Sequence, residues 1–160
     1  MPVHTNRAAS SSFLLPSDPD GDTFAYERAL REQGFLHIAG VDEAGRGPLA
    51  GPVVAACVLF SLHCETQAYK DSKKITARQR EILFEKLHNS DAAFGVGIAE
   101  PAEIQRINIL QASLLAMRRA VHDCAGQSAL SPDFLLVDGI FKVPMDLPQL
   151  TLIRGESKSA

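Results

Sequence analysis

A glycine-rich run that begins with two adjacent carboxylates joins two strand-like segments, and it constrains the fold more than any other part of the chain. Residues 36–41 are strand-like, residues 42–48 have the sequence DEAGRGP, and the β-branched, apolar residues 53–60 follow. Glycine adopts backbone conformations that are closed to other residues, so Gly45 and Gly47 predict a special turn. We therefore expect two adjacent strands joined by this turn, with the carboxylates at the end of the first strand.

The rest of the chain alternates between helix and strand patterns. After Pro101, apolar residues recur at spacings of three and four, which predicts a long amphipathic helix that breaks near Asn108 and ends by Gly126. Capping residues, glycines and short apolar runs predict further helices at 23–33 and 76–88, and strands at 94–99, 134–137 and 150–153. Because such apolar strands suit a sheet buried on both faces, we expect an α/β fold with a mixed sheet flanked by helices.

Length and composition place these elements in one domain. The chain has 160 residues, of which 46% are hydrophobic, and this is enough to bury a core. Residues 1–22 are rich in Ser, Pro, Asp and Gly and lack periodicity, so we expect a mobile extension. The folded domain is then expected at residues 23–160.

Several classes of protein are disfavoured. No apolar run approaches the roughly 20 residues of a membrane-spanning helix, and residues 1–16 lack the hydrophobic stretch of a secretory signal, so we expect a cytoplasmic protein. Cys57, Cys64 and Cys124 form no zinc-like spacing and are expected to be reduced thiols that pack as small apolar groups. The formal charge of −3 argues against binding to nucleic acid through bulk electrostatics, so any such binding must be local.

Three carboxylates stand where open α/β sheets place their ligands, namely Asp42 and Glu43 after the first strand and Asp138 after a later one. Such oxygen ligands favour Mg²⁺ or Mn²⁺, and magnesium sites often include substrate phosphate. Adjacent residues of a regular strand point to opposite faces. We expect the glycine-rich turn to bend the chain directly after Asp42 and to aim Glu43 at the same crevice. Taken alone, Asp138-Gly139 would suit an ordinary turn or cap better than a ligand site.

The turn at Gly45, Arg46 and Gly47 is also a candidate substrate contact. Its spacing matches neither a nucleotide-binding P-loop nor a dinucleotide fingerprint. What remains is a narrow turn whose bare backbone could approach a ribose or phosphate closely, beside the forked donor of Arg46.

Two clusters of basic residues have different expected roles. Ser72, Lys73 and Lys74 precede the helix at 76–88, where they would form either a solvated surface or a contact with a sugar-phosphate backbone. Their place beside a candidate metal site favours the contact. Arg118 and Arg119 lie on the expected exposed side of the long helix, and we predict no role for them beyond solubility.

Four blocks of the chain resemble the prokaryotic type 2 ribonucleases H, the ribonuclease HII family. Residues 38–54 have the sequence IAGVDEAGRGPLAGPVV, which is similar to the family signature residue for residue. The further blocks follow in family order: DSKK at 71–74, INILQAS at 107–113 followed by AM at 116–117, and VDG at 137–139. The resemblance covers nearly everything after the N-terminal extension.

The resemblance implies a ribonuclease H fold and a monomeric endonuclease that cleaves RNA within RNA–DNA hybrids and incises duplex DNA beside an embedded ribonucleotide. Asp42, Glu43 and Asp138 match the family's metal-binding carboxylates, which implies two-metal catalysis with Mn²⁺ or Mg²⁺ and products with 3′-hydroxyl and 5′-phosphate ends. The turn at residues 45–47 matches the element that recognises the ribose 2′-OH, the group that distinguishes RNA from DNA.

The chain also departs from the family pattern. Gln105 and Glu156 stand where members commonly have Asp, but neither is a matched catalytic position. Members continue past Ala160 into a helix with a fourth catalytic Asp and later a Tyr, so we expect the C-terminal helical part to be missing. The main alternative is therefore an inactive, hybrid-binding fragment. A small-molecule phosphotransferase is a further alternative, which nucleotide-dependent phosphoryl transfer would reveal.

Overall fold

The computed structural model describes residue 14 and residues 24–47, 50–61, 76–127 and 129–153. These residues form, in chain order, α1 (Ala25–Glu32), β1 (Ile38–Ala44), β2 (Val53–Leu59), α2 (Ala77–His88), β3 (Ala93–Ala99), α3 (Pro101–Gln127), β4 (Phe134–Asp138) and β5 (Gln149–Leu152). Every expected helix and strand is present, with bounds shifted by a few residues. The predicted α/β fold with a mixed sheet is confirmed.

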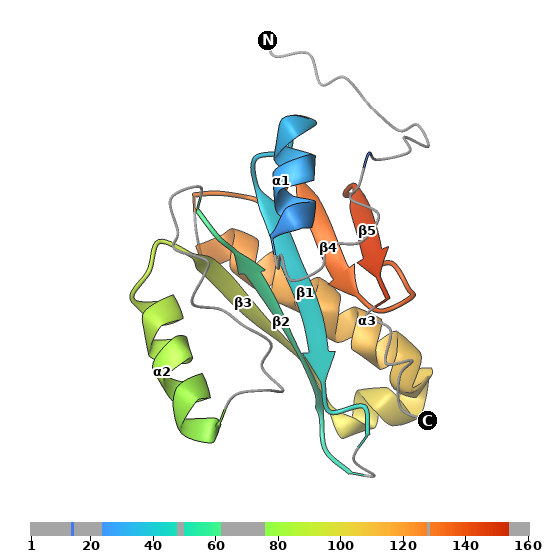
Figure 1. Ribbon diagram of the computed structural model, residues 1–160. Coiled ribbons are helices and arrows are strands. Elements are labelled where there is room, and N and C mark those ends of the chain that lie inside the picture. The colour runs from blue at the N-terminus through green and yellow to red at the C-terminus, as the bar shows by residue number, and fades with distance from the viewer. Residues whose placement is uncertain (1–13, 15–23, 48–49, 62–75, 128, 154–160) are drawn as a thin grey trace, which may run out of the picture.

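The five strands form one sheet in the order β3-β2-β1-β4-β5. The pairs β1–β2 and β2–β3 are antiparallel, whereas β1–β4 and β4–β5 are parallel. The carboxyl ends of β1, β4 and β5 therefore meet at one edge of the sheet. Figure 1 shows α1 on one face of the sheet and α3 on the other.

The two faces of the sheet bury different sets of residues, as the strand periodicity requires. Ala39 and Val41 of β1 join the larger core cluster, which lies beneath α3. Ile38 of β1 instead packs with Phe134 and with Leu30 of α1 in a smaller cluster. Even-numbered positions of β1 therefore belong to the α1 face, and odd-numbered positions belong to the α3 face.

Backbone-to-backbone packing brings α3 unusually close to β3. A Cβ atom built on Gly97 would overlap the carbonyl oxygen of Ala116, and one built on Gly95 would lie 2.8 Å from the Cα atom of Cys124. The facing positions of α3 are small and buried, including Ala116 and Ala120. Small residues of α3 therefore allow this close contact.

Two of the three cysteines are buried in this core. Cys57 of β2 and Cys124 of α3 are free thiols with no exposed surface. A hydrogen bond with Cys124 and burial both raise the pKa of the Cys57 thiol, so this thiol stays protonated. The expected packing as small apolar groups is confirmed for these two residues, and Cys64 lies outside the described residues.

The predicted break in the long helix is confirmed at Asn108, which has φ 70° and ψ 166°. The Asn108 side-chain oxygen accepts a hydrogen bond of 3.0 Å from the backbone N–H of Gln111. Asn108 therefore caps the second half of α3 in the manner of an N-terminal capping residue.

An ion pair bridges the two halves of α3, and it corrects the prediction that Arg119 has no role. Both terminal nitrogens of Arg119 donate to the carboxylate oxygens of Glu103 at 2.8 Å, and Nη1 also donates to the carbonyl oxygen of Ile98 at 2.6 Å. Glu103 precedes the break and Ile98 belongs to β3, so Arg119 ties both parts of the helix to the sheet. Arg118 is exposed, as expected.

Local signals near the helix ends are also borne out. Thr76 and Gln79 form the predicted capping box at the start of α2.

The expected mobile extension lies outside the described residues, with the exception of Leu14. The backbone carbonyl of Leu14 accepts a hydrogen bond of 2.9 Å from the Gln33 side chain, and its N–H donates one of 3.3 Å to that side chain. Within the described ranges, no helix is long and apolar enough to cross a membrane.

We predict that Gly97→Ala destabilises the fold by about 2–3 kcal/mol, because α3 must move away from β3 to admit the methyl group. Urea unfolding monitored by circular dichroism measures the change. Gly40→Ala is the matched control, since Gly40 also lies in the sheet and a Cβ there meets nothing within 4 Å. Equal stability of the two variants would contradict the close packing of α3.

We also predict a pH-dependent contribution from Glu103. The hydrogen bond from Arg119 lowers the Glu103 pKa from its ordinary value of 4.5 to about 2. The contribution of the ionised Glu103 to the stability of the fold is therefore fully present above pH 4.5 and is lost as the pH falls toward 2. The difference in Tm between the wild type and Glu103→Gln should shrink over this interval in thermal scans, with a substitution at the exposed Glu81 of α2, Glu81→Gln, as the control. A pH-independent difference would argue against the ion pair.

Candidate active site

Asp42 and Asp138 lie at the same edge of the sheet and on the same face. Val41 of β1 and Val137 of β4 are paired in the parallel register, and the two aspartates are the next residues of their strands. Neighbouring strands lie about 4.8 Å apart, and residues in equivalent positions share a face. Asp42 is exposed and Asp138 is half-buried, so both carboxylates are open to solvent at the carboxyl ends of the parallel strands.

The expected bend directly after Asp42 is wrong. β1 stays paired with β2 through Ala44, with Asp42 opposite Ala56 and Glu43 opposite Ala55. Because successive residues of a paired strand point to opposite faces, Glu43 belongs to the α3 face and Asp42 to the α1 face. The chain departs from strand geometry only at Gly45, which has φ +94°.

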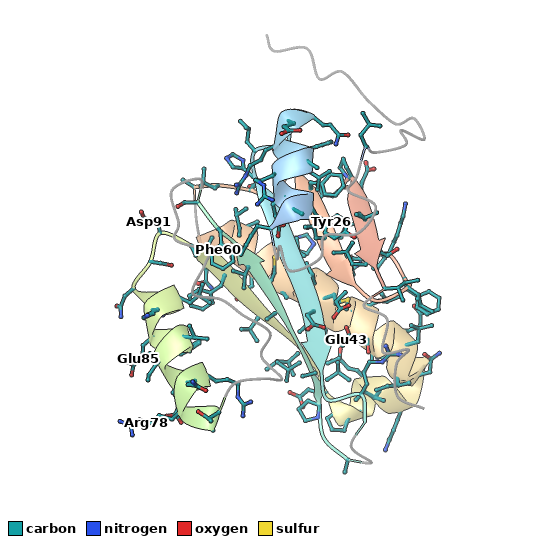
Figure 2. All side chains as sticks on the ribbon, in the orientation of Figure 1. Tyr26, Glu43, Phe60, Arg78, Glu85 and Asp91 are labelled. Carbon is teal, nitrogen blue, oxygen red and sulfur yellow. The ribbon has the colours of Figure 1, made fainter. Side chains whose placement is uncertain are left out.

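Glu43 is held by an ion pair. Its Oε1 atom lies 3.0 Å from Arg46 Nη1, and the Glu43 side chain is only 11% exposed. Its backbone N–H donates a hydrogen bond of 2.7 Å to Asp42 Oδ1, which orients the Asp42 carboxylate. Figure 2 places Glu43 near the carboxyl end of β1.

The structure thus brings Asp42 and Asp138 to one site but does not gather all three carboxylates. Among the residues that it describes, no group of three His, Cys, Asp or Glu side chains is arranged to hold a metal ion. The two aspartates still supply hard oxygen donors from adjacent strands, which suits Mg²⁺ or Mn²⁺ bound together with phosphate oxygens. The donor chemistry fits such an ion, and a third protein ligand would require Glu43 to leave Arg46.

The glycines of the turn have distinct environments. At Gly45 a Cβ would lie 2.6 Å from the carbonyl oxygen of Pro52, and the φ of +94° is one that other residues rarely adopt. At Gly47 a Cβ would meet no atom of the described residues within 4 Å, so these residues leave the backbone there open to a ligand. Arg46 between them is about half-exposed. The fold therefore favours glycine strongly at position 45, whereas the described surroundings of Gly47 would admit a side chain.

The other expected substrate-binding residues, Ser72, Lys73 and Lys74, lie outside the described residues. One residue of the site region was missed by sequence reasoning. Gln149 is buried and holds the connection between β4 and β5: its Oε1 accepts from Val143 N–H at 2.8 Å, and its Nε2 donates to the Val143 carbonyl at 3.0 Å. No local pattern distinguishes a buried Gln of this kind from an exposed one.

Comparisons with known proteins bear on the family and the fold of the chain. The family model described as ribonuclease HII matches residues 39–152. A ribonuclease HII from Desulfotalea psychrophila is 52% identical over 139 residues, covering 87% of this chain and 61% of the relative. One from Syntrophotalea carbinolica is 49% identical over 146 residues, covering 91% and 68%. The crystal structure of ribonuclease H2 from Pyrococcus horikoshii has a TM-score of 0.56 and 26% identity, covering 78% of this chain and 65% of that one. The chain therefore spans about two thirds or less of the length of these relatives.

We predict that Gly45→Ala destabilises the protein by about 2 kcal/mol or more, because it combines a disfavoured φ with a contact to the Pro52 carbonyl. Gly47→Ala, two residues away in the same turn, should change stability by less than about 0.5 kcal/mol. Thermal and urea unfolding of both variants measure the contrast. If Gly47→Ala were as damaging as Gly45→Ala, the open environment of Gly47 would be incorrect.

Proposed function

Because the chain belongs to the ribonuclease HII family, we propose that it is a metal-dependent endonuclease that cleaves the RNA strand of RNA–DNA hybrids. The observation that carries this proposal is the placement of Asp42 and Asp138 on the same edge and face of β1 and β4. Both residues fall inside the span that matches the family model. We extend the proposal to incision of duplex DNA at embedded ribonucleotides.

Asp42 and Asp138 are proposed to hold divalent metal, with Glu43 as a third ligand. A bound Mn²⁺ or Mg²⁺ would polarise a water molecule and stabilise charge on the leaving oxygen, and cleavage would then leave 3′-hydroxyl and 5′-phosphate ends. The carboxylate of Asp42 is oriented in advance by the Glu43 backbone N–H. This orientation lowers the cost of arranging the site around the substrate.

Glu43 and Arg46 are proposed to exchange partners when substrate binds. In the free chain they neutralise each other at 3.0 Å. If Glu43 turns toward the aspartates, the guanidinium of Arg46 is released, and its forked donors match the geometry of a phosphate group. The same event would then complete the carboxylate set and provide a phosphate contact.

Ribonucleotide recognition is proposed to involve the turn at Gly45, Arg46 and Gly47. The open environment of Gly47 supports close approach of its backbone to the ribose, whose 2′-OH is both a donor and an acceptor. Ser72, Lys73 and Lys74 are proposed to contact the sugar-phosphate backbone. These local contacts would provide affinity that the net charge of −3 does not.

A second candidate function is binding of hybrids without cleavage. It is favoured by the separation of Glu43 from the two aspartates, since no three-ligand metal group occurs in the described part of the chain. A labelled duplex with one ribonucleotide distinguishes the two functions when it is incubated with the protein in manganese and in magnesium. Cleavage supports the endonuclease, whereas a shifted but intact duplex supports the binding function.

We predict that Asp42→Asn lowers the cleavage rate by at least a hundredfold and leaves Tm within a few degrees of the wild type, because a neutral amide cannot replace a carboxylate at a cation site. Single-turnover cleavage of the duplex measures the rate. Asp91→Asn is the control, since Asp91 is exposed near the start of β3, at the other end of the sheet from Glu43 (Figure 2). A near-normal rate for Asp42→Asn would refute the metal assignment.

A further inference from the structure

Two large apolar side chains are exposed immediately after the candidate metal-binding carboxylate of β4. Ile140 is 63% exposed and Phe141 is 45% exposed, and both follow Asp138-Gly139 directly. The next residue, Lys142, is also exposed. An apolar pair followed by a cation is a combination that suits nucleic acid, which presents apolar sugar and base surfaces beside phosphates.

This exposure is not the result of a loosely held loop. Val143, the next residue after Lys142, is 1% exposed and belongs to the larger core cluster. The Gln149 side chain holds both the N–H and the carbonyl of Val143 and also donates to the Leu147 carbonyl at 3.3 Å. The segment is therefore anchored at its far end, and Ile140 and Phe141 remain exposed on a supported backbone.

The anchored segment starts at the candidate active site. The N–H of Gly139 still donates to the carbonyl of Leu152 at 3.0 Å, so the chain leaves the sheet at the edge that carries Asp42 and Asp138. Phe141 is three residues from Asp138, which limits the distance between their Cα atoms to about 11 Å. On the scale of B-form DNA, with roughly 3.4 Å of rise per pair, that reach corresponds to about three base pairs.

We propose that Ile140 and Phe141 pack against the sugars and base edges of the bound RNA–DNA duplex within about three base pairs of the cleaved bond, and that Lys142 contacts a phosphate of the same strand. This inference rests on the proposed function. The wide, shallow minor groove of an A-form duplex is accessible to such side chains. The exposed lysine beside the apolar pair supplies the positive charge that a phosphate contact needs.

The test is a binding measurement with the full chain and a fluorescein-labelled RNA–DNA hybrid. Anisotropy is recorded in calcium over a series of salt concentrations, with a gel to verify that the duplex stays intact. Phe141→Ala should weaken binding about tenfold, whereas Phe141→Tyr should retain wild-type affinity. Lys142→Gln should reduce the slope of log K against log salt by about 1.

Matched controls show whether a change in affinity is specific to this contact or follows from the removal of any exposed side chain. Leu36→Ala removes a residue that is 51% exposed just before β1, at the other end of the sheet, and it should leave the affinity unchanged. Lys86→Gln removes an exposed lysine of α2 and should leave the salt slope unchanged. Tm of every variant should stay close to that of the wild type, because the substituted side chains are exposed.

The outcomes distinguish this inference from the proposed function. If the wild-type chain does not bind the hybrid, the proposed function fails and the inference fails with it. If the wild type binds and Phe141→Ala binds within twofold of it, only the inference is overturned. If Phe141→Ala instead dissociates an oligomer seen by light scattering while duplex affinity is unchanged, the apolar pair is a protein interface and the inference is likewise overturned.

Discussion

Direct contact between the backbones of α3 and β3 is the constraint on which the rest of the structure depends. Gly95 and Gly97 leave no room for a Cβ, and α3 meets them with small residues such as Ala116 and Ala120. This close approach seats α3 on the sheet, where it covers Ala39 and other core residues of β1 and β2. Interiors pack at high density, so an added methyl group here would displace the whole helix.

The position of the candidate site follows from the same sheet. β1 is central, held by antiparallel pairing to β2 on one side and by parallel pairing to β4 on the other. The parallel pair brings Asp42 and Asp138 to one edge and one face. The antiparallel pair, which continues to Ala44, keeps Glu43 on the opposite face and in contact with Arg46. The hydrogen-bonded ladder therefore decides which carboxylates can act together in the free chain.

Two polar side chains hold segments outside the sheet in place through hydrogen bonds. Arg119 joins both halves of the broken helix to the end of β3, and Gln149 fixes the crossover that begins beside Asp138. Because the chain carries a net negative charge, the nucleic-acid binding that we propose has to rely on a few local contacts near the carboxylates. A supported segment with an exposed apolar pair and a lysine is well placed to provide one of them.

The sequence by itself determined the order and type of every described helix and strand, the capping box at Thr76, the break at Asn108 and the family. These features depend on local periodicity, on capping chemistry and on a specific motif, which a single chain segment contains. The sequence also predicted that Asp42 and Asp138 lie at the ends of strands.

Only the tertiary structure decided how far β1 continues, and with it the side on which Glu43 lies. The bend expected after Asp42 depended on glycine's freedom, but pairing with β2 favours a regular strand until Gly45. The roles of Arg119 and Gln149 were equally hidden, because their partners are distant in sequence or are backbone groups of a crossover. A local sequence pattern limits the roles that a residue can have. The packing of the whole chain then sets its hydrogen-bonding partners, and these partners decide which role the residue takes.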